Sequence, residues 1–115
     1  MSISSVVAEM ARALDPVISD AASRQRLAAV AEMPKFVAEE RLDLWEEALL
    51  SHGRVPKETA QELAVAELIE LARFNMFGEI DEDETRLYLE RAIASARAAG
   101  ATVDIERDAA DITDW

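Results

Sequence analysis

Hydrophobic and polar positions recur at helical spacing along most of the chain and predict about five helices. Near the start, the apolar positions are Ile3, Val6, Val7, Met10 and Leu14, which share one face of a helix. All three prolines stand where a helix is expected to begin, and all three glycines where one is expected to end. This asymmetry is typical of helices. Because no sustained strand-like alternation competes with it, the predicted fold class is all-α.

The stretch 56–77 is the expected central helix of a bundle. Its polar stripe runs through Glu62, Ala66, Glu70 and Arg73, and is flanked by Glu67. The other positions are mostly apolar, and an apolar arc that wide needs neighbours on at least two sides. At 1.5 Å per residue such a helix is about 30 Å long, which is about the width of a compact domain of this size.

The remaining helices are expected between the other prolines and glycines. A second helix begins at Asp15-Pro16 and ends before Pro34, with a break near 20–23 where the apolar face changes direction. A third helix spans 34–52. Its single apolar stripe consists of Ala38, Leu42, Trp45 and Leu49.

The end of the chain divides into a helix and an acidic tail. Asp81 and Glu84 fit a capping box, which opens a last helix that continues to Gly100. Residues 101–115 form the tail, which either docks as a short helix or is disordered. The sequence therefore predicts one helical bundle domain, residues 1–100, followed by the tail, residues 101–115.

Charge is the most distinctive compositional feature. The chain holds 24 acids and 12 bases, for a net charge of −12. Residues 1–57 contain 9 acids and 7 bases, whereas residues 58–115 contain 15 acids and 5 bases. A negative field repels nucleic-acid phosphates and steers a basic protein partner. The simpler interpretation, that the acidity only maintains solubility, stays open.

Composition also limits the compartment and the chemistry. The chain has no cysteine, which excludes disulfides, a thiol nucleophile and thiolate metal sites. No apolar run approaches the roughly 20 residues of a membrane span, and no secretory signal pattern is present. We therefore expect a cytoplasmic protein that does not bind a membrane.

Catalytic and metal-binding patterns are sparse. A carboxylate-bridged di-iron bundle needs two Glu-x-x-His pairs, but His52 is the only histidine. A calcium loop that starts at Asp81 fails, because Arg86 stands where glycine is required and Ala92 where glutamate is required. Each glycine stands alone, which excludes a glycine-rich phosphate loop. The sequence therefore favours a non-enzyme without a metal or cofactor.

Glu70 is the one carboxylate with a conceivable catalytic role. If the fold buries it, its pKa would rise and it would become a functional-site candidate. The alternative is a surface pair with Arg73, three residues further along the helix.

Two groups of residues are candidates for binding a basic partner. The acidic group contains Glu79, Asp81, Glu82, Asp83, Asp104, Asp108 and Asp111. The apolar group contains Phe74, Phe77 and Trp115. Alternatively, the first acids only cap and stabilise a helix, the two phenylalanines pack in the corner between the last two helices, and the tryptophan folds back onto the bundle.

Three functions stay open. The leading one is a non-enzymatic protein-interaction module that binds a basic protein, as an inhibitor, immunity, antitoxin-like or regulatory accessory protein. The second is a structural subunit that forms a homodimer, because short alanine-rich helices cover a broad apolar helix poorly. The third is a small-molecule-binding or catalytic bundle with Glu70 in an apolar pocket.

Overall fold

The computed structural model of the chain describes residues 3–50, 55–77 and 82–104. In these ranges the chain forms helices and no strand, which confirms the all-α prediction. The elements are α1 (Ile3–Leu14), the short 3-10 helix η1 (Asp15–Val17), α2 (Ala21–Ala38), α3 (Leu42–Leu50), α4 (Ala60–Phe77) and α5 (Glu82–Ala98).

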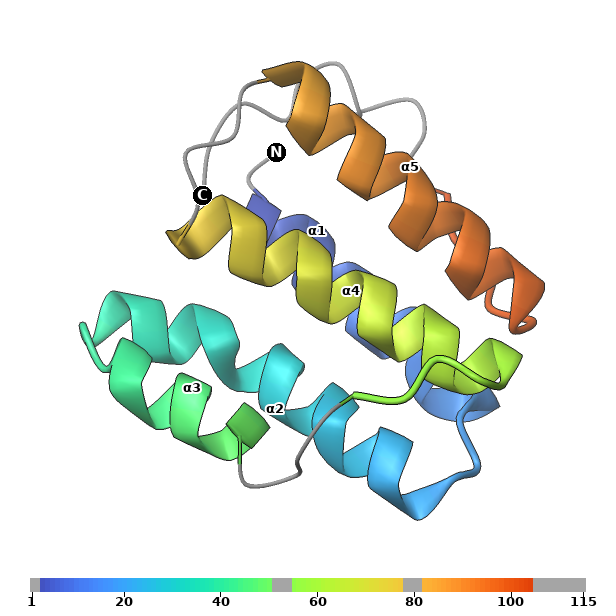
Figure 1. The fold of residues 1–115 in the computed structure, drawn as a ribbon, viewed down its shortest axis with the longest axis horizontal. Helices are drawn as coiled ribbons and strands as arrows, with labels where there is room; N and C mark the ends of the chain where they lie inside the picture. The colour runs from blue at the N-terminus through green and yellow to red at the C-terminus, as the bar shows by residue number, and fades with distance from the viewer. Residues whose placement is uncertain (1–2, 51–54, 78–81, 105–115) are drawn as a thin grey trace.

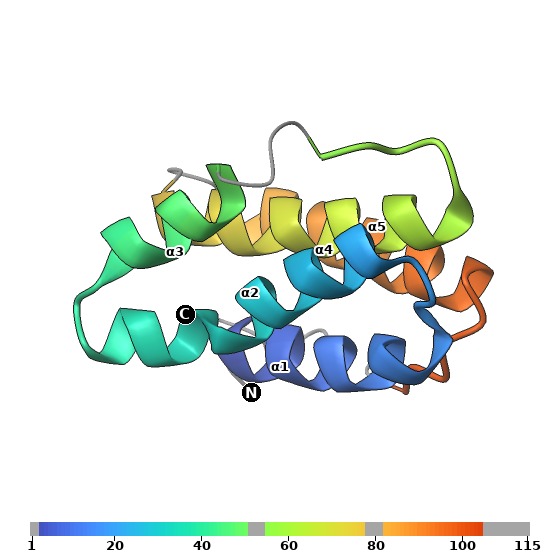
Figure 2. The ribbon, with the colours of Figure 1, turned by 90° about the horizontal axis from the view of Figure 1, so that it is seen from below.

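The predicted central helix, α4, lies in the middle of the bundle (Figure 1). α5 runs antiparallel to it on one side, α2 and α3 lie on the other side, and α1 packs behind it (Figures 1 and 2). The radius of gyration is 12.9 Å, close to the value of about 13 Å typical of a compact chain of this length. One copy of the chain therefore reaches the compactness of a folded domain.

The middle of α4 has almost no exposed side. Every residue in 64–69 is buried, and so are Leu71 and Ala72. α4 contacts α1, α2 and α5, so helices of the same chain cover it on three sides. The broad apolar arc that suggested a homodimer is thus accounted for within one copy, and the homodimer stays an untested prediction.

The polar stripe predicted for α4 is wrong in its centre. Ala66 and Glu67 are buried, whereas Glu62 and Glu70 are half-buried and Arg73 is exposed. The physical reason is that α5 packs along this side of α4 and supplies a basic side chain to the buried glutamate. Only the two ends of the stripe reach solvent.

α4 begins at Ala60, four residues later than the start of the expected range 56–77. A capping box fixes the start of the helix at this point. The Glu62 N–H donates to Thr59 Oγ1 at 3.1 Å, and the Thr59 N–H donates to Glu62 Oε1 at 3.0 Å. These two bonds satisfy backbone donors that a helix leaves unpaired at its start. The cap therefore overrides the preference of Pro56 for a first helical position.

α1 confirms the predicted apolar face. Its apolar positions, spaced three or four residues apart, are all buried: Ile3, Val6, Val7, Met10 and Leu14. This stripe packs on α2 and α4, so α1 is the layer behind the central helix (Figure 2).

α2 differs from the prediction at its internal proline. A break is present but lies at 18–20, slightly earlier than the predicted 20–23, because η1 ends at Val17 and α2 begins at Ala21. However, Pro34 lies inside α2 and does not begin a third helix, so the expected helix 34–52 is wrong. An internal proline removes one backbone hydrogen bond, and α2 changes direction along its length (Figures 1 and 2).

The real boundary before α3 lies after Ala38. Glu40 has a φ of +56°, and the Arg41 N–H donates to the Phe36 carbonyl at 2.7 Å. This is the usual left-handed closure of a helix, here made without glycine. As a result Ala38, which the prediction placed on the apolar stripe of the third helix, is exposed, whereas Trp45 on α3 is fully buried.

α5 ends with the same type of closure, but at a glycine. Gly100 has a φ of +100°, and the Ala101 N–H donates to the Ala96 carbonyl at 3.0 Å. The chain then turns back so that Ala101 and Val103 are buried against the core. The first residues of the predicted tail thus belong to the packed bundle, and residues 105–115 lie outside the described residues.

Candidate partner-binding surface

The structure describes the side chains of three candidate binding residues. Phe74, Asp83 and Asp104 are all exposed. Phe77 and Glu82 lie in helices, but their side chains are outside the described set, as are Glu79, Asp81, Asp108, Asp111 and Trp115. Asp83 lies in the first turn of α5, which has 17 residues and is about 25 Å long, whereas Asp104 follows Val103, whose carbonyl accepts a hydrogen bond from Arg97 in the last turn. These two acids therefore do not form one cluster.

Phe74 forms an aromatic pair across the two last helices. Its ring centroid lies 4.7 Å from that of Tyr88, and the two ring planes differ by 17°, which is a stacked arrangement. Phe74 is nevertheless 41% exposed, and Leu87, which precedes Tyr88 in the chain, is 53% exposed. The expectation that Phe74 packs inside the corner is therefore wrong, because its ring lies on the outer edge of the α4–α5 contact. Phe74, Leu87 and Tyr88 are called the α4–α5 patch below.

An arginine of α5 extends this aromatic pair. The Arg91 Cζ lies over the Tyr88 ring, 5.7 Å from its centroid, within the range of a cation–π contact. The same guanidinium forms an ion pair with Glu67, with 3.1 Å between Nη2 and Oε1. Phe74, Tyr88, Arg91 and Glu67 thus form one chain of contacts between α4 and α5.

Glu67 is the buried acid of this chain of contacts. It is only 5% exposed, and a buried carboxylate is costly unless it is paired and hydrogen-bonded. Arg91 contacts Oε1, but within the part of the chain that the structure describes Oε2 is buried and accepts no hydrogen bond. The seam beneath the α4–α5 patch therefore holds a carboxylate with unused capacity to accept hydrogen bonds.

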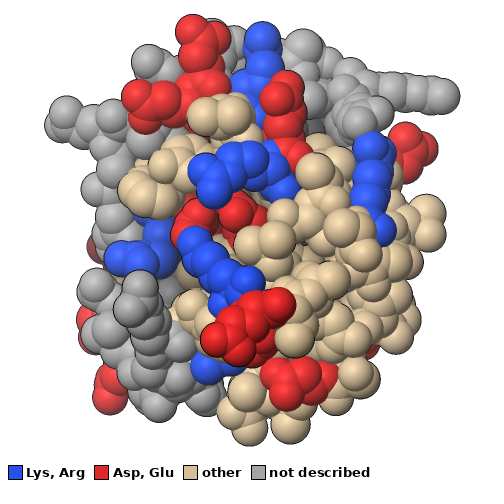
Figure 3. Space-filling model, turned by 45° about the vertical axis from the view of Figure 1, so that its right-hand side comes forward, with Lys and Arg blue, Asp and Glu red and all other residues tan. Residues whose placement is uncertain are grey.

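The surroundings of the patch on α5 carry both signs of charge. Asp83, Glu84 and Glu90 are exposed within one turn of Leu87, and Arg86 is exposed beside it. Acidic and basic side chains are also interspersed on the face drawn in Figure 3, next to a broad area of uncharged residues. The local excess of acid comes from the first turn of α5, where Glu82, Asp83 and Glu84 follow one another.

Among the described residues, Glu70 lines neither of the two depressions described below and pairs with a lysine. Its carboxylate forms an ion pair with Lys57 from the segment before α4, not with Arg73 as expected. Glu70 is partly exposed, with 25% of its side chain accessible. The pairing follows from the chain path, which lays residues 55–59 along α4 before the helix begins (Figure 1).

A depression at the starts of α2 and α4 is lined by helix-capping residues. It has a volume of about 460 Å³ and is bordered by Asp20, Thr59, Ala60, Gln61 and Glu62. Gln61 Oε1 accepts a hydrogen bond of 2.9 Å from the Ser19 N–H and so ties the two helix starts together. The capping atoms are used within the protein, so this depression has a structural explanation.

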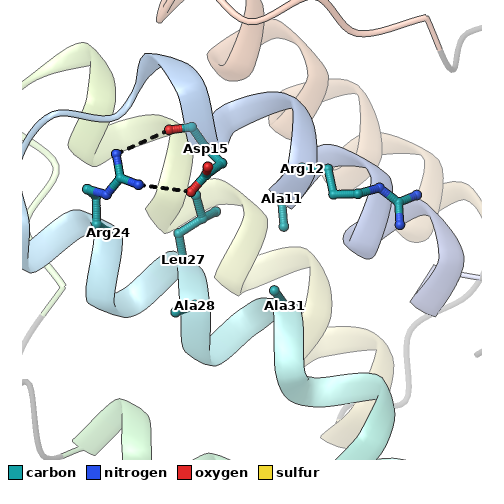
Figure 4. A pocket seen from close by; sticks show the side chains of 7 residues that line it. All are labelled: Ala11, Arg12, Asp15, Arg24, Leu27, Ala28 and Ala31. Carbon is teal, nitrogen blue, oxygen red and sulfur yellow. Dashed lines mark hydrogen bonds and ion pairs between the residues drawn. The ribbon is translucent and has the colours of Figure 1, made fainter.

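A second depression, of about 260 Å³, lies between α1 and α2 (Figure 4). Its floor is formed by Ala11, Leu27, Ala28 and Ala31. At one edge Arg24 pairs with Asp15 at 3.3 Å and donates to the Ile18 carbonyl at 3.0 Å, whereas Arg12 extends along the other edge (Figure 4). Arg24 therefore supports the turn between the two helices.

Sequence reasoning missed Leu87 and Tyr88 as parts of the patch, and the pair of Arg91 and Glu67 beneath it. One signal was available for Leu87, because it lies off the stripe of Leu89, Ala92, Ile93 and Ala96 that α5 buries. The contact between Glu67 and Arg91 joins residues 24 positions apart in the chain. No pattern within a single helix could reveal it.

Across residues 3–50, 55–77 and 82–104, no three Asp, Glu or His side chains come together as a metal-binding group. None of the helices in those ranges combines the length and the apolar character needed to cross a bilayer. No family model, curated protein or solved structure matches the chain.

Proposed function

We propose that the chain is a non-enzymatic protein-interaction module that binds a basic protein surface through the α4–α5 patch. The observation that carries the proposal is the joint exposure of Phe74 and Leu87 beside the stacked Tyr88. A ring that stays partly exposed beside its stacking partner, with an exposed leucine on the same pair of helices, is a candidate for an interaction surface. An aromatic centre with a polar rim is also the usual composition of protein interfaces.

The acidic start of α5 gives this surface a preference for positive charge. Asp83 and Glu84 are exposed one turn before Leu87 and Tyr88, and the whole chain carries a net charge of −12. Such a field accelerates encounter with a basic surface. The apolar patch then supplies the contact area that charge alone lacks. The role would be that of an inhibitor, an antitoxin-like protein or another regulatory accessory protein.

The test begins by identifying a partner with the intact protein. Proteins retained from a lysate of the source cells would be compared for wild type, Leu87→Ser and the matched control Ala31→Ser, which changes an exposed residue of α2. A partner of the proposed kind is basic, is retained by wild type and by Ala31→Ser, and is lost with Leu87→Ser. Equal retention by all three proteins would contradict the proposal.

Charge reversal then tests steering on the identified partner. Asp83→Lys on α5 and Glu32→Lys on α2 change the net charge equally, and both residues are exposed. We expect Asp83→Lys to lower the association rate more than it raises the dissociation rate, because steering acts on encounter. Equal rates for the two variants in surface plasmon resonance would show that only overall charge matters.

A further inference from the structure

In the chain of contacts between α4 and α5, a guanidinium lies on an aromatic face. The outermost ring of that chain, Phe74, is partly exposed to solvent. Arg91 lies over Tyr88, and Tyr88 stacks on Phe74. Phe74 is 41% exposed, so part of its surface is available for a further contact. The protein itself thus demonstrates one arginine–aromatic contact next to a free aromatic surface.

We infer that the α4–α5 patch selects arginine over lysine in its partner, with the guanidinium of that arginine stacked on Phe74. This inference rests on the proposed function, because it specifies which basic side chain the patch binds. A guanidinium is planar and weakly hydrated and stacks on aromatic rings, whereas an ammonium ion is compact and strongly hydrated. An exposed ring therefore discriminates between the two cations.

Exposed acids at the start of α5 supply the negative charge that such a cation needs. Asp83 and Glu84 are exposed on the first turn of α5, one turn before Tyr88. Glu67 is a buried carboxylate in the same seam, and among the described residues nothing donates to its Oε2. Arg91 engages its Oε1, so this pair carries no net charge, and the negative charge comes from the acids of α5.

Leu87 defines the rest of the expected partner. It is 53% exposed, one position before Tyr88 on α5, and contact with another molecule would bury its apolar surface. The matching ligand is an amphipathic basic segment with an arginine beside an aliphatic residue. Arg73, exposed next to Phe74 on α4, repels such an arginine and weakens its binding.

The probes are three synthetic fluorescein-labelled helical peptides with a leucine face and with Arg, Lys or Glu at every charged position. Dissociation constants are measured by fluorescence anisotropy with the intact protein. For wild type we expect the arginine peptide to bind about two- to fivefold more tightly than the lysine peptide, the range of a cation–π contact at an exposed site.

Phe74→Leu is the decisive variant, because it keeps an apolar side chain and removes the aromatic face. It should abolish the preference for arginine and leave the affinity for the lysine peptide unchanged. Arg73→Ala should strengthen binding of the arginine peptide, whereas Arg12→Ala, an equal charge change on α1, should not. Circular dichroism melts confirm that each variant is folded.

Each other outcome overturns a defined part of the proposal. Equal affinity of wild type for the two basic peptides, or a preference that survives Phe74→Leu, would overturn the arginine inference alone. Binding of neither basic peptide above the glutamate peptide would overturn the proposed function as well. Sedimentation that shows a wild-type dimer lost with Phe74→Leu would assign the patch to a second copy of the chain and reject the inference.

Discussion

Within the described residues, the two longest helices, α2 and α4, each have 18 residues but occupy opposite kinds of environment. α4 is buried around most of its middle, where leucine, isoleucine and valine face three other helices. α2 buries one stripe, centred on Leu27, Val30 and Met33, and exposes alanines such as Ala28 and Ala31. An exposed alanine costs little because its apolar area is small. Apolar content therefore predicts a central helix only when the apolar side chains are large.

The most severe test of this contrast compares Leu68 in α4 with Ala31 in α2. Leu68→Ala should lower the free energy of unfolding by about 2–5 kcal/mol, because it leaves a cavity in a fully buried region. Ala31→Ser should change it by at most about 0.5 kcal/mol, as expected at an exposed site. Urea unfolding followed by circular dichroism measures both values. Similar losses would mean that α4 is not the centre of the core.

A smaller effect distinguishes the two ion pairs of α4. In double-mutant cycles, the coupling free energy between Glu67 and Arg91 should be about 1–2 kcal/mol, since the carboxylate is buried but the arginine is half exposed. The coupling between Glu70 and Lys57 should be below about 1 kcal/mol, as for other solvent-accessible pairs. A larger value for the second pair would show that burial of Glu67 does not strengthen its interaction.

The smallest expected effect concerns the start of α2 and depends on pH. The Ser23 hydroxyl donates to Asp20 Oδ2 at 2.7 Å and the Ser23 N–H at 2.9 Å, and these bonds lower the pKa of the Asp20 carboxyl. A carboxyl whose pKa is lowered by folding stabilises the fold above its unfolded pKa of about 3.9 and loses that contribution as the pH falls through the folded pKa. The difference in melting temperature between wild type and Asp20→Ala should therefore shrink below about pH 4. A difference that stays constant down to pH 2, well below that value, would contradict the capping role.

More of the fold than of the candidate surface could be predicted from the sequence. The buried face of α1 follows directly from its apolar spacing, which needs no information about other helices. Pro34 misled the prediction because proline is a good start signal, yet packing of the fully buried Met33 keeps it inside α2. The burial of Glu67 depends on Arg91, which comes from another helix, so no local pattern could reveal it.

The helix contacts described above also imply an order of folding. α1 with α2, α2 with α3, and α4 with α5 are neighbours in the chain, so each pair closes only a short loop before its contacts form. α4 must then reach α1 and α2 from further along the chain, which places its insertion late on the folding pathway. Truncation of Leu68 should accordingly act mainly by accelerating unfolding, with little change in the refolding rate.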